Sequence, residues 1–368
     1  MDVEQYTKRG VPLPVSDFLL LAIYALFYPL VFGLLVIGLG YLINNDLLFY
    51  ISLTVISLGL FLTMLLFFYK SYTELRSHAI EVAHVHFQPS WREVIIHLIT
   101  QVYSVVFLGI LLAIFFGSTI IDLPQWQYLG LALIISLGYQ GMFIILSLNS
   151  KRKLLATAQT PVSTEIVNHV RQNHPNNHLI NEFRFADVEL ASLFLSAGVM
   201  TLGWKKNICL ISQYFNWKLT DEELIAVLSH EEGHLARHHI RTAYLILGTE
   251  GILRTFRIFI VLNALILILN DLPILAFNTF SLIFLILIIL VFLTSTCLVL
   301  TQRYRVYLQE IRVDCYGGNL VGHEILANTL KKLPSIIPAP IGSHQLDFLT
   351  FRIALLREQA NKLKSKTE

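Results

Sequence analysis

Residues 279–300 of the chain read TFSLIFLILIILVFLTSTCLVL and contain no charged side chain. The hydrocarbon core of a membrane is about 30 Å thick, and a helix of about 20 apolar residues crosses it. This stretch therefore predicts a transmembrane helix. Three further stretches meet the same test and a fourth is slightly more polar but long enough; in chain order they are residues 18–43, 47–69, about 99–121, and 128–148.

A sixth predicted span is less regular. Residues 258–269 are strongly apolar but too few, so the span must include part of 244–257, which contains Glu250, Arg254 and Arg257. A charge at the bilayer centre costs about 2.5–3.5 kcal/mol on insertion scales. We therefore expect these charges near the cytoplasmic interface, with the long arginine side chains reaching toward water and Glu250 paired with Arg254 one turn away.

The composition of the whole chain agrees with a membrane protein. Of its 368 residues, 55% are hydrophobic and 14% are charged, whereas about 25% are charged in a typical soluble domain. The net charge of +2 provides no basic field for a polyanion. These values exclude a disordered chain, a nucleic-acid-binding protein that relies on a basic surface, and an ordinary soluble enzyme. The cysteines are odd in number and far apart, so we expect reduced structural thiols.

The distribution of basic residues predicts the orientation. All 27 lysines and arginines lie outside three short connections, which are residues 44–46, 122–127 and 270–278. Because basic loops stay on the cytoplasmic side, the pattern predicts six spans with both termini in the cytoplasm. The first apolar run is too long for a cleavable signal peptide, and a second run follows it at once.

Two polar segments, 149–243 and 301–368, are expected to form the cytosolic part. The first predicts a helix at 162–173, a bend at 196–198, and strands at 180–185, 189–195 and 207–212. Thr220 followed by Glu223 is typical of a capping box and begins a helix that we expect to run without interruption over 221–240. The second segment is largely helical, with a proline-containing loop at 334–343.

The chemistry is concentrated in His230-Glu231-Glu232-Gly233-His234, which has the form HExxH. A helix places His230 and His234 on one face, where two imidazoles can bind one zinc ion. Glu231 is turned about 100° away, so its carboxylate can reach a water on the metal rather than the metal. Zinc lowers the pKa of that water to about 7, and a nearby carboxylate can then take its proton. We predict Glu231 as the general base.

A catalytic zinc usually has a third protein ligand from another element. Glu310 and Asp314 lie one helical turn apart, just after the last predicted span. Glu310 offers the third ligand. Asp314 could accept a hydrogen bond from a ligand imidazole and fix the orientation of its ring.

Residues 219–234, LTDEELIAVLSHEEGH, resemble the membrane-embedded zinc peptidases of the HtpX-like and CAAX-prenyl-protease type. In those gluzincins an "ELxAVLAHELGH" helix is followed, after a membrane hairpin, by a helix of the form "ExxAD". The second motif here is Glu310-x-x-Val313-Asp314, and a late "HP…RI..LR" run is similar to Ser343-His344 and residues 352–357. The BlaR-type sensor peptidases share much of this pattern. The resemblance extends from Val162 onward.

The resemblance implies one zinc ion per chain, with His230, His234 and Glu310 as ligands, Glu231 as general base and Asp314 behind the ligands. It further implies that His344 and Arg352 bind substrate or stabilise the tetrahedral oxyanion. The chain departs from the family pattern at several places: Glu232 replaces an apolar residue, His344 lacks its following proline, residues 307–309 contain no arginine, and residues 195–198 replace an Asn-Ala-Phe edge strand.

We therefore expect a multi-span α-helical membrane protein, with about six transmembrane helices and a cytosolic α+β zincin-like catalytic domain split by a membrane hairpin. The expected parts are a membrane domain at 1–148, the first catalytic part at 149–243, the hairpin at 244–300 and the second catalytic part at 301–368. Such a protein, in the inner membrane of a bacterium, would cleave membrane-associated proteins or peptides at the cytosolic face. Its partners would be a peptide substrate, extended beside an edge strand near Cys209, and the lipid bilayer, with no nucleic acid. The sequence does not fix the oligomeric state.

Two other functions stay open. His230–His234 and His238–His239 resemble fragments of the histidine boxes of membrane di-iron hydroxylases and desaturases, although such sites need more histidines in separate boxes. A sensor peptidase that acts once, on itself or on a regulator, is the other, although the short outer loops provide no extracytoplasmic ligand domain. In the zinc reading, His238 and His239 are interfacial or surface residues, because a continuous helix turns His239 away from the His230 face.

Overall fold

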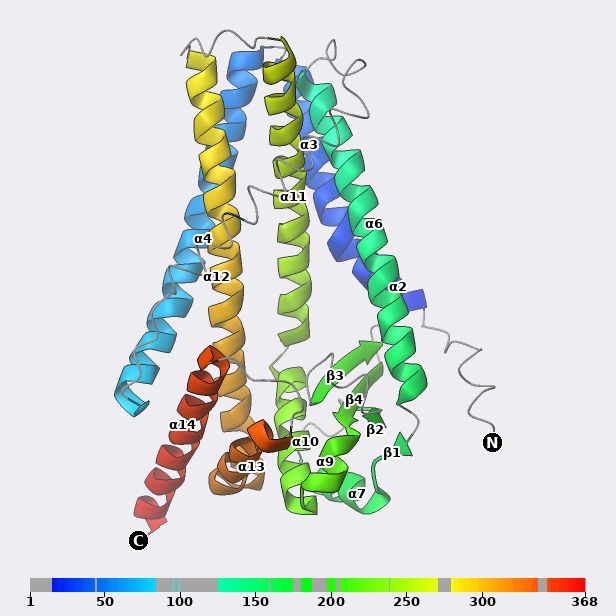
Figure 1. Cartoon of the computed structure of the whole chain (residues 1–368), viewed down its shortest axis with the longest axis vertical. Coiled ribbons are helices and arrows are strands. Elements are labelled where there is room, and N and C mark those ends of the chain that lie inside the picture. The colour runs from blue at the N-terminus through cyan, green and yellow to red at the C-terminus, as the bar shows by residue number, and fades with distance from the viewer. Residues whose placement is uncertain are drawn as a thin grey trace.

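The computed structural model of the chain describes residues 15–43, 45–83, 95, 99, 125–158, 160–174, 180–186, 197–202, 206–237, 239–270, 279–336 and 343–367. This part of the protein is mostly helical and contains one small sheet (Figure 1). Long helices run along the molecule and form one end of it by themselves. The sheet and several shorter helices lie at the other end.

Four helical segments in the described part of the chain are long and apolar enough to cross a membrane: Leu19–Ile43, Asp46–Arg76, Gln127–Ala156 and Leu282–Val321. They cover most of each predicted span that begins near residue 18, 47, 128 or 279. The first comprises α2 (Val15–Ala22), the π-helical turn η1 (Ile23–Phe27) and α3 (Tyr28–Ile43), and the others lie in α4 (Asp46–Ala83), α6 (Gln125–Thr157) and α12 (Thr279–Val321). Many large apolar side chains on these helices are exposed, including Leu42 at 80%. The chain therefore has the helices of a membrane protein.

Of the two other predicted spans, one lies mostly outside the described residues and the other lies within a long helix. The span at 99–121 lies, after residue 99, outside the described residues. The irregular sixth span is part of a continuous helix, α11 (His239–Asn270). The expected pair within it is present, with Arg254 Nη2 2.9 Å from Glu250 Oε1, and the Arg254 guanidinium also stacks on the ring of Tyr139 at 4.1 Å. Six spans stay a prediction.

Small residues and polar contacts join the long helices. A Cβ on Gly33 of α3 would lie 2.7 Å from the Leu133 side chain of α6, and a Cβ on Gly251 of α11 would lie 2.5 Å from Pro29. Glycine therefore permits these helices to approach each other closely, as is common in membranes. Tyr50 of α4 donates a 2.6 Å hydrogen bond to the side-chain oxygen of Asn263 in α11.

The sheet has the strand order β1-β2-β4-β3, with strands β1 (Thr160–Pro161), β2 (Glu182–Ala186), β3 (Ala197–Leu202) and β4 (Lys206–Ser212). β2 is parallel to β4, whereas β3 is antiparallel to β4. The alternating side chains of Phe183, Phe185, Cys209 and Ile211 are buried together against helix α7 (Thr164–Asn173) and the HExxH helix. This is the period of two expected for a strand with one buried face.

The structure confirms the helix predicted at 162–173 and the strands predicted at 180–185 and 207–212, within a few residues. The predicted bend at 196–198 is wrong, because Ala197 and Gly198 already belong to β3 and pair with Ile211 and Leu210. Ladder pairing with β4 outweighs the weak local preference of these small residues. The strand predicted at 189–195 lies outside the described residues.

The uninterrupted helix predicted over 221–240 is also wrong. After the short α9 (Gln213–Lys218), helix α10 (Asp221–Ala236) ends at a cap residue, Arg237, whose ψ of 6° is not helical. A new helix, α11, begins at His239. The break separates two packing environments, because α10 packs on α12, α13 and the sheet, whereas α11 packs mainly on the long helices α3, α6 and α12.

The last part of the chain is helical, as expected. Gly322 has a φ of 99°, a conformation that favours glycine, and separates α12 from α13 (His323–Ile336). The loop predicted at 334–343 is shorter than expected, since Pro334 lies in the last turn of α13 and Ser343 begins α14 (Ser343–Thr367). Helix α14 packs against α13, α4 and α12.

Candidate metal centre

The HExxH motif lies on α10, and a capping box fixes the start of that helix. The Thr220 hydroxyl accepts from the Glu223 amide at 3.4 Å, while the Glu223 carboxylate accepts from the Thr220 amide at 3.0 Å. Glu223 also forms an ion pair with Lys332 of α13, at 2.5 Å. Burial alone would raise the pKa of Glu223, but the hydrogen bond from Lys332 and those at the cap lower it.

Two glycines allow α10 to pack closely against α12. A Cβ on Gly233 would lie 2.9 Å from the Val313 side chain, and a Cβ on Gly317 would lie 3.2 Å from the His230 amide nitrogen. Both distances are shorter than ordinary van der Waals contact, so a larger residue at either position would push the helices apart. This close packing brings the motif helix to the turn of α12 that carries Glu310.

Glu310 faces both histidines of the motif. Its Oε2 atom lies 3.4 Å from His230 Nε2, and its Oε1 atom lies 3.5 Å from His234 Nε2. The potential ligand atoms of His230, Glu231 and His234 also lie within 4.8 Å of one another. Two imidazole nitrogens and a carboxylate are the donor set of a catalytic zinc site with three protein ligands. The residues therefore fit such a metal ion.

Asp314 and Arg352 lie directly behind this group. Asp314 Oδ1 is 2.9 Å from His230 Nδ1, so it can accept from the ring nitrogen that faces away from Glu310. Arg352 of α14 donates to both Asp314 oxygens, at 2.5 and 2.7 Å, and its Nη1 lies 3.1 Å from Glu310 Oε2. The guanidinium thus joins the two carboxylates of α12.

The charges of Glu310, Asp314 and Arg352 and those of the two motif histidines shift one another's pKa values. Burial alone would lower the pKa of His230, but its contacts with Asp314 and Glu310 raise that pKa to about 10. Burial and the charge of His230 lower the pKa of His234 to about 4. Burial also opposes the charged form of Arg352, yet Asp314 and Glu310 raise its pKa. The two carboxylates therefore favour a cation beside the motif histidines, in agreement with the metal-ion fit.

His239 is closer to the motif than the sequence predicted. Its Nδ1 lies 3.1 Å from His234 Nδ1, and the two ring centroids are 5.3 Å apart. The surface position expected for His239 assumed a continuous helix, and the break at Arg237 removes that assumption. Burial lowers the pKa of His239 to about 4. His238 lies outside the described residues.

Glu232, the departure from the family pattern, is fully buried and bound on two sides. Its Oε2 lies 2.5 Å from His174 Nδ1, and its Oε1 accepts from the Tyr316 hydroxyl at 2.9 Å. The other ring nitrogen of His174 lies 3.2 Å from the Ser229 hydroxyl. Neither His174 nor Tyr316 was predicted from the sequence as a partner of Glu232. A buried carboxylate needs hydrogen-bond partners, so Glu232 on the motif helix indicated that partners exist. The sequence did not indicate which residues they are.

Glu231, the predicted general base, and Cys209, near the predicted substrate strand, are both buried. Glu231 is 6% exposed. Cys209 is fully buried, and burial followed by the charge of Glu231 raises the pKa of its thiol well above the usual value, so the thiol stays neutral. Cys209 lies on β4, which pairs with β2 and β3, and Val199 of β3 is its partner in the ladder. Among the described strands, β3 is the edge on that side. An edge strand therefore lies next to Cys209, as expected, while the binding of a substrate beside it stays a prediction.

His344 lies in the first turn of α14, and its side chain is outside the described part of the structure. Its predicted role is therefore not tested. Arg352, two helical turns later, is described, and its contacts are with Asp314 and Glu310 as given above.

Comparison with known proteins agrees with this geometry. Residues 197–344 match the model of peptidase family M48. The resemblance to HtpX-like and CAAX-protease metallopeptidases is thereby confirmed, and the match indicates a metallopeptidase, which is a hydrolase. Peptidases of this family depend on a metal ion, typically zinc. The match does not favour the di-iron alternative. No curated protein and no solved structure matches the chain.

Proposed function

We propose that this chain, whose residues 197–344 match the metallopeptidases of family M48, is an integral-membrane zinc endopeptidase that cleaves membrane-associated proteins or peptides at the cytosolic face. One observation carries the proposal. The carboxylate of Glu310 faces the Nε2 atoms of both His230 and His234, at 3.4 and 3.5 Å, although the two motifs are separated by a long helical hairpin.

The three residues would hold the metal, which when bound supplies a Lewis acid for activating water and polarising the peptide carbonyl. Asp314 would hold the His230 ring by accepting from its Nδ1–H, leaving Nε2 for the metal. Arg352 would fix both α12 carboxylates and keep them ionised. These contacts support the roles of Glu310 and Asp314 that the sequence suggested.

Glu231 would act as the general base. Its carboxylate would accept a proton from the attacking water and return it to the amide nitrogen as the carbon–nitrogen bond breaks. The Cys209 thiol lies nearby, but its raised pKa makes it a poor competitor for this role. A substrate segment would add to the edge strand β3 through main-chain hydrogen bonds, a mode that reads the backbone more than side chains.

The test is cleavage of casein and of a membrane-derived peptide by the purified full-length protein and by Glu231→Gln. Glu222→Gln, an exposed acid about two helix turns before the motif, is the matched control. We expect the Glu231→Gln protein to retain its zinc and lose at least a hundredfold in kcat, in the range of general-base catalysis. The control should keep full activity. Equal activity in Glu231→Gln and the natural chain would refute the mechanism.

Metal analysis tests the ligand set separately. The natural protein should hold one zinc ion per chain and no iron, and a chelator should abolish cleavage until zinc is restored. Glu310→Gln should bind zinc more weakly, whereas Glu324→Gln, on the neighbouring helix α13, should not. A chain that holds iron, or a Glu310→Gln protein with unchanged zinc affinity, would contradict this ligand set.

A further inference from the structure

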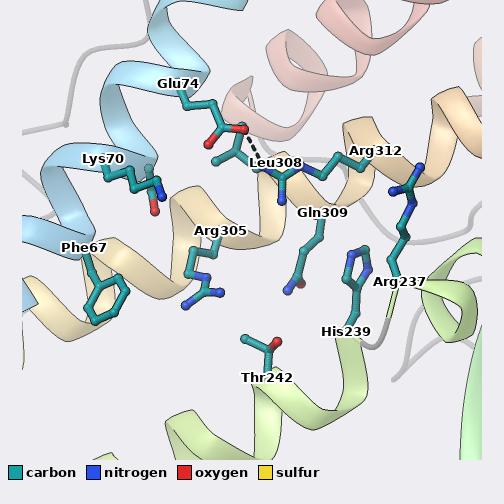
Figure 2. Close-up of a pocket in the computed structure, with 11 residues that line it drawn as sticks. Phe67, Lys70, Glu74, Arg237, His239, Thr242, Arg305, Leu308, Gln309 and Arg312 are labelled. Atoms are coloured by element: carbon teal, nitrogen blue, oxygen red, sulfur yellow. Dashed lines mark hydrogen bonds and ion pairs between the residues drawn. The ribbon is translucent and has the colours of Figure 1, made fainter.

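A second candidate site lies beside the metal centre, in a pocket of about 430 Å³ between α4, α12 and the start of α11 (Figure 2). Its lining is rich in cations: Lys70 from α4, Arg305 and Arg312 from α12, and Arg237 at the break before α11. Glu74 is the one acidic side chain among the described residues that line it, and Glu74 is paired with Arg312. The pocket therefore has an excess of positive charge.

The pocket lies at the distance along α4 and α12 where the apolar part of each helix ends. α4 and α12 start at the same end of the molecule and run side by side in the same direction (Figure 1). The first basic residue of α4 is Lys70, and that of α12 is Arg303. Each follows the start of its helix by about 24 residues, or ~36 Å at 1.5 Å per residue. That length slightly exceeds the ~30 Å hydrocarbon core, so spans that enter the hydrocarbon at the start of these helices would place Lys70 and the first basic turn of α12 near the lipid phosphates.

The side chains of the pocket are suited to a phosphate. Figure 2 shows the Arg305 guanidinium directed into the space between α12 and α11, with Gln309 and Thr242 beside it. A guanidinium binds phosphate oxygens through two parallel N–H donors, and a lysine adds a mobile point charge. The amide of Gln309 and the hydroxyl of Thr242 can donate further hydrogen bonds. Phe67 gives the α4 side an apolar wall.

We propose that this pocket binds a phosphate group, held by Arg305 together with Lys70. An anionic phospholipid headgroup and a soluble phosphate compound share this chemistry. The two cations of Arg305 and Lys70 favour a phosphate, which can carry two negative charges, over a singly charged peptide carboxylate. His239 lines the pocket and also contacts His234, so a bound phosphate would lie next to the metal centre.

The experiment measures the thermal unfolding of the full-length protein in neutral detergent. One arm adds inorganic phosphate, compared with potassium chloride at equal ionic strength. The other arm adds phosphatidylglycerol to the micelles, compared with phosphatidylcholine. The variants are Arg305→Gln and its matched control Arg303→Gln, which lies two residues away on α12, is exposed and does not line the pocket. Lys70→Gln provides a second pocket variant should Arg305→Gln fold poorly.

We expect at least one phosphate probe to raise the unfolding temperature of the natural protein and of Arg303→Gln. The pocket variants should need about tenfold more of that probe for the same shift, as for the loss of a charge-assisted contact. A response to phosphatidylglycerol alone would identify a lipid headgroup, and a response to inorganic phosphate would identify a soluble ligand.

The proposal is wrong if the natural protein, the pocket variants and Arg303→Gln respond alike to both probes. A peptide carboxylate is the alternative ligand. In that case neither phosphate probe would shift the unfolding temperature differently in Arg305→Gln and the natural protein, but Arg305→Gln would slow cleavage of acidic peptides and not of matched neutral ones. That result would also show the proposal to be wrong. The binding readout requires no cleavage and should be unchanged in Glu231→Gln. Failure of the proposed peptidase function would therefore be distinguishable from failure of this proposal.

Discussion

Gly317 of α12 packs directly against the backbone of His230, since a Cβ at Gly317 would lie 3.2 Å from the His230 amide nitrogen and 3.3 Å from its Cα. The contact is between backbones, so it cannot be relieved by turning a flexible side chain. It sets the spacing between the helix that carries the two histidines and the helix that carries Glu310.

Gly317→Ala should therefore move α12 away from α10 and separate Glu310 from the histidines. We expect about a tenfold or greater loss of kcat/KM and weaker zinc binding, because small displacements of reacting groups are costly. Gly59→Ala is the control, since a Cβ there meets nothing within 4 Å. The measurements are zinc affinity by competition with a chelator and peptide cleavage. Normal zinc affinity in Gly317→Ala would show that the helix spacing tolerates the extra methyl group.

Arg352→Lys should weaken zinc binding about 10- to 100-fold, which is typical of changes behind the ligands of a metal site. A lysine cannot contact Asp314 at two atoms and Glu310 at once, as the Arg352 guanidinium does. Arg357→Lys, on the same helix, should have no such effect. A variant with full zinc affinity and a reduced kcat would instead favour direct contact between Arg352 and the oxyanion, the role suggested by the family resemblance.

Glu232→Leu should be strongly destabilising, because it leaves His174 buried without its carboxylate partner and removes the acceptor of Tyr316. Breaking a buried pair on one side costs about 3–5 kcal/mol. The double variant His174→Leu/Glu232→Leu should be less destabilised than the sum of the two single variants. The free energy of unfolding in denaturant, taken as a double-mutant cycle, measures this coupling. Purely additive effects would mean that the two side chains do not stabilise each other.

The capping carboxylate predicts a pH dependence of stability. The pKa of Glu223 is lowered in the folded protein, where Lys332 and the Thr220 amide bind its ionised form. A lowered pKa means that the stabilisation is complete above the unfolded value of about 4.3. It is lost as the pH falls through the lower folded value.

Glu223→Gln should therefore destabilise the protein at neutral pH, and the difference from the natural chain should shrink as the solution is acidified toward the folded pKa of Glu223. Glu222→Gln, its exposed neighbour, should show little effect at any pH. Thermal unfolding across this pH range is the measurement. A difference that stays constant on acidification would assign the effect to lost hydrogen bonds rather than to the charge.

Local sequence determined the apolar helices, the start of the motif helix and the placement of its two histidines on one face. The uncharged apolar runs determined which helices are long and apolar enough to enter a membrane, because burying polar groups in hydrocarbon is costly. Thr220 and Glu223 determined where α10 begins, through contacts three residues apart. The spacing of His230 and His234 placed two imidazoles on one face, because the helix period alone decides which side chains are neighbours.

Tertiary structure decided the contacts between residues that are far apart in the chain. The break at Arg237, which brings His239 to His234, follows from the different packing environments of α10 and α11. His174 and Tyr316 became the partners of Glu232 only when α7 and α12 packed on either side of α10. The approach of Glu310 to the histidines depends on two glycines and on helix packing across a long separation in the chain. No local pattern encodes such a distance, because it results from the packing of whole helices.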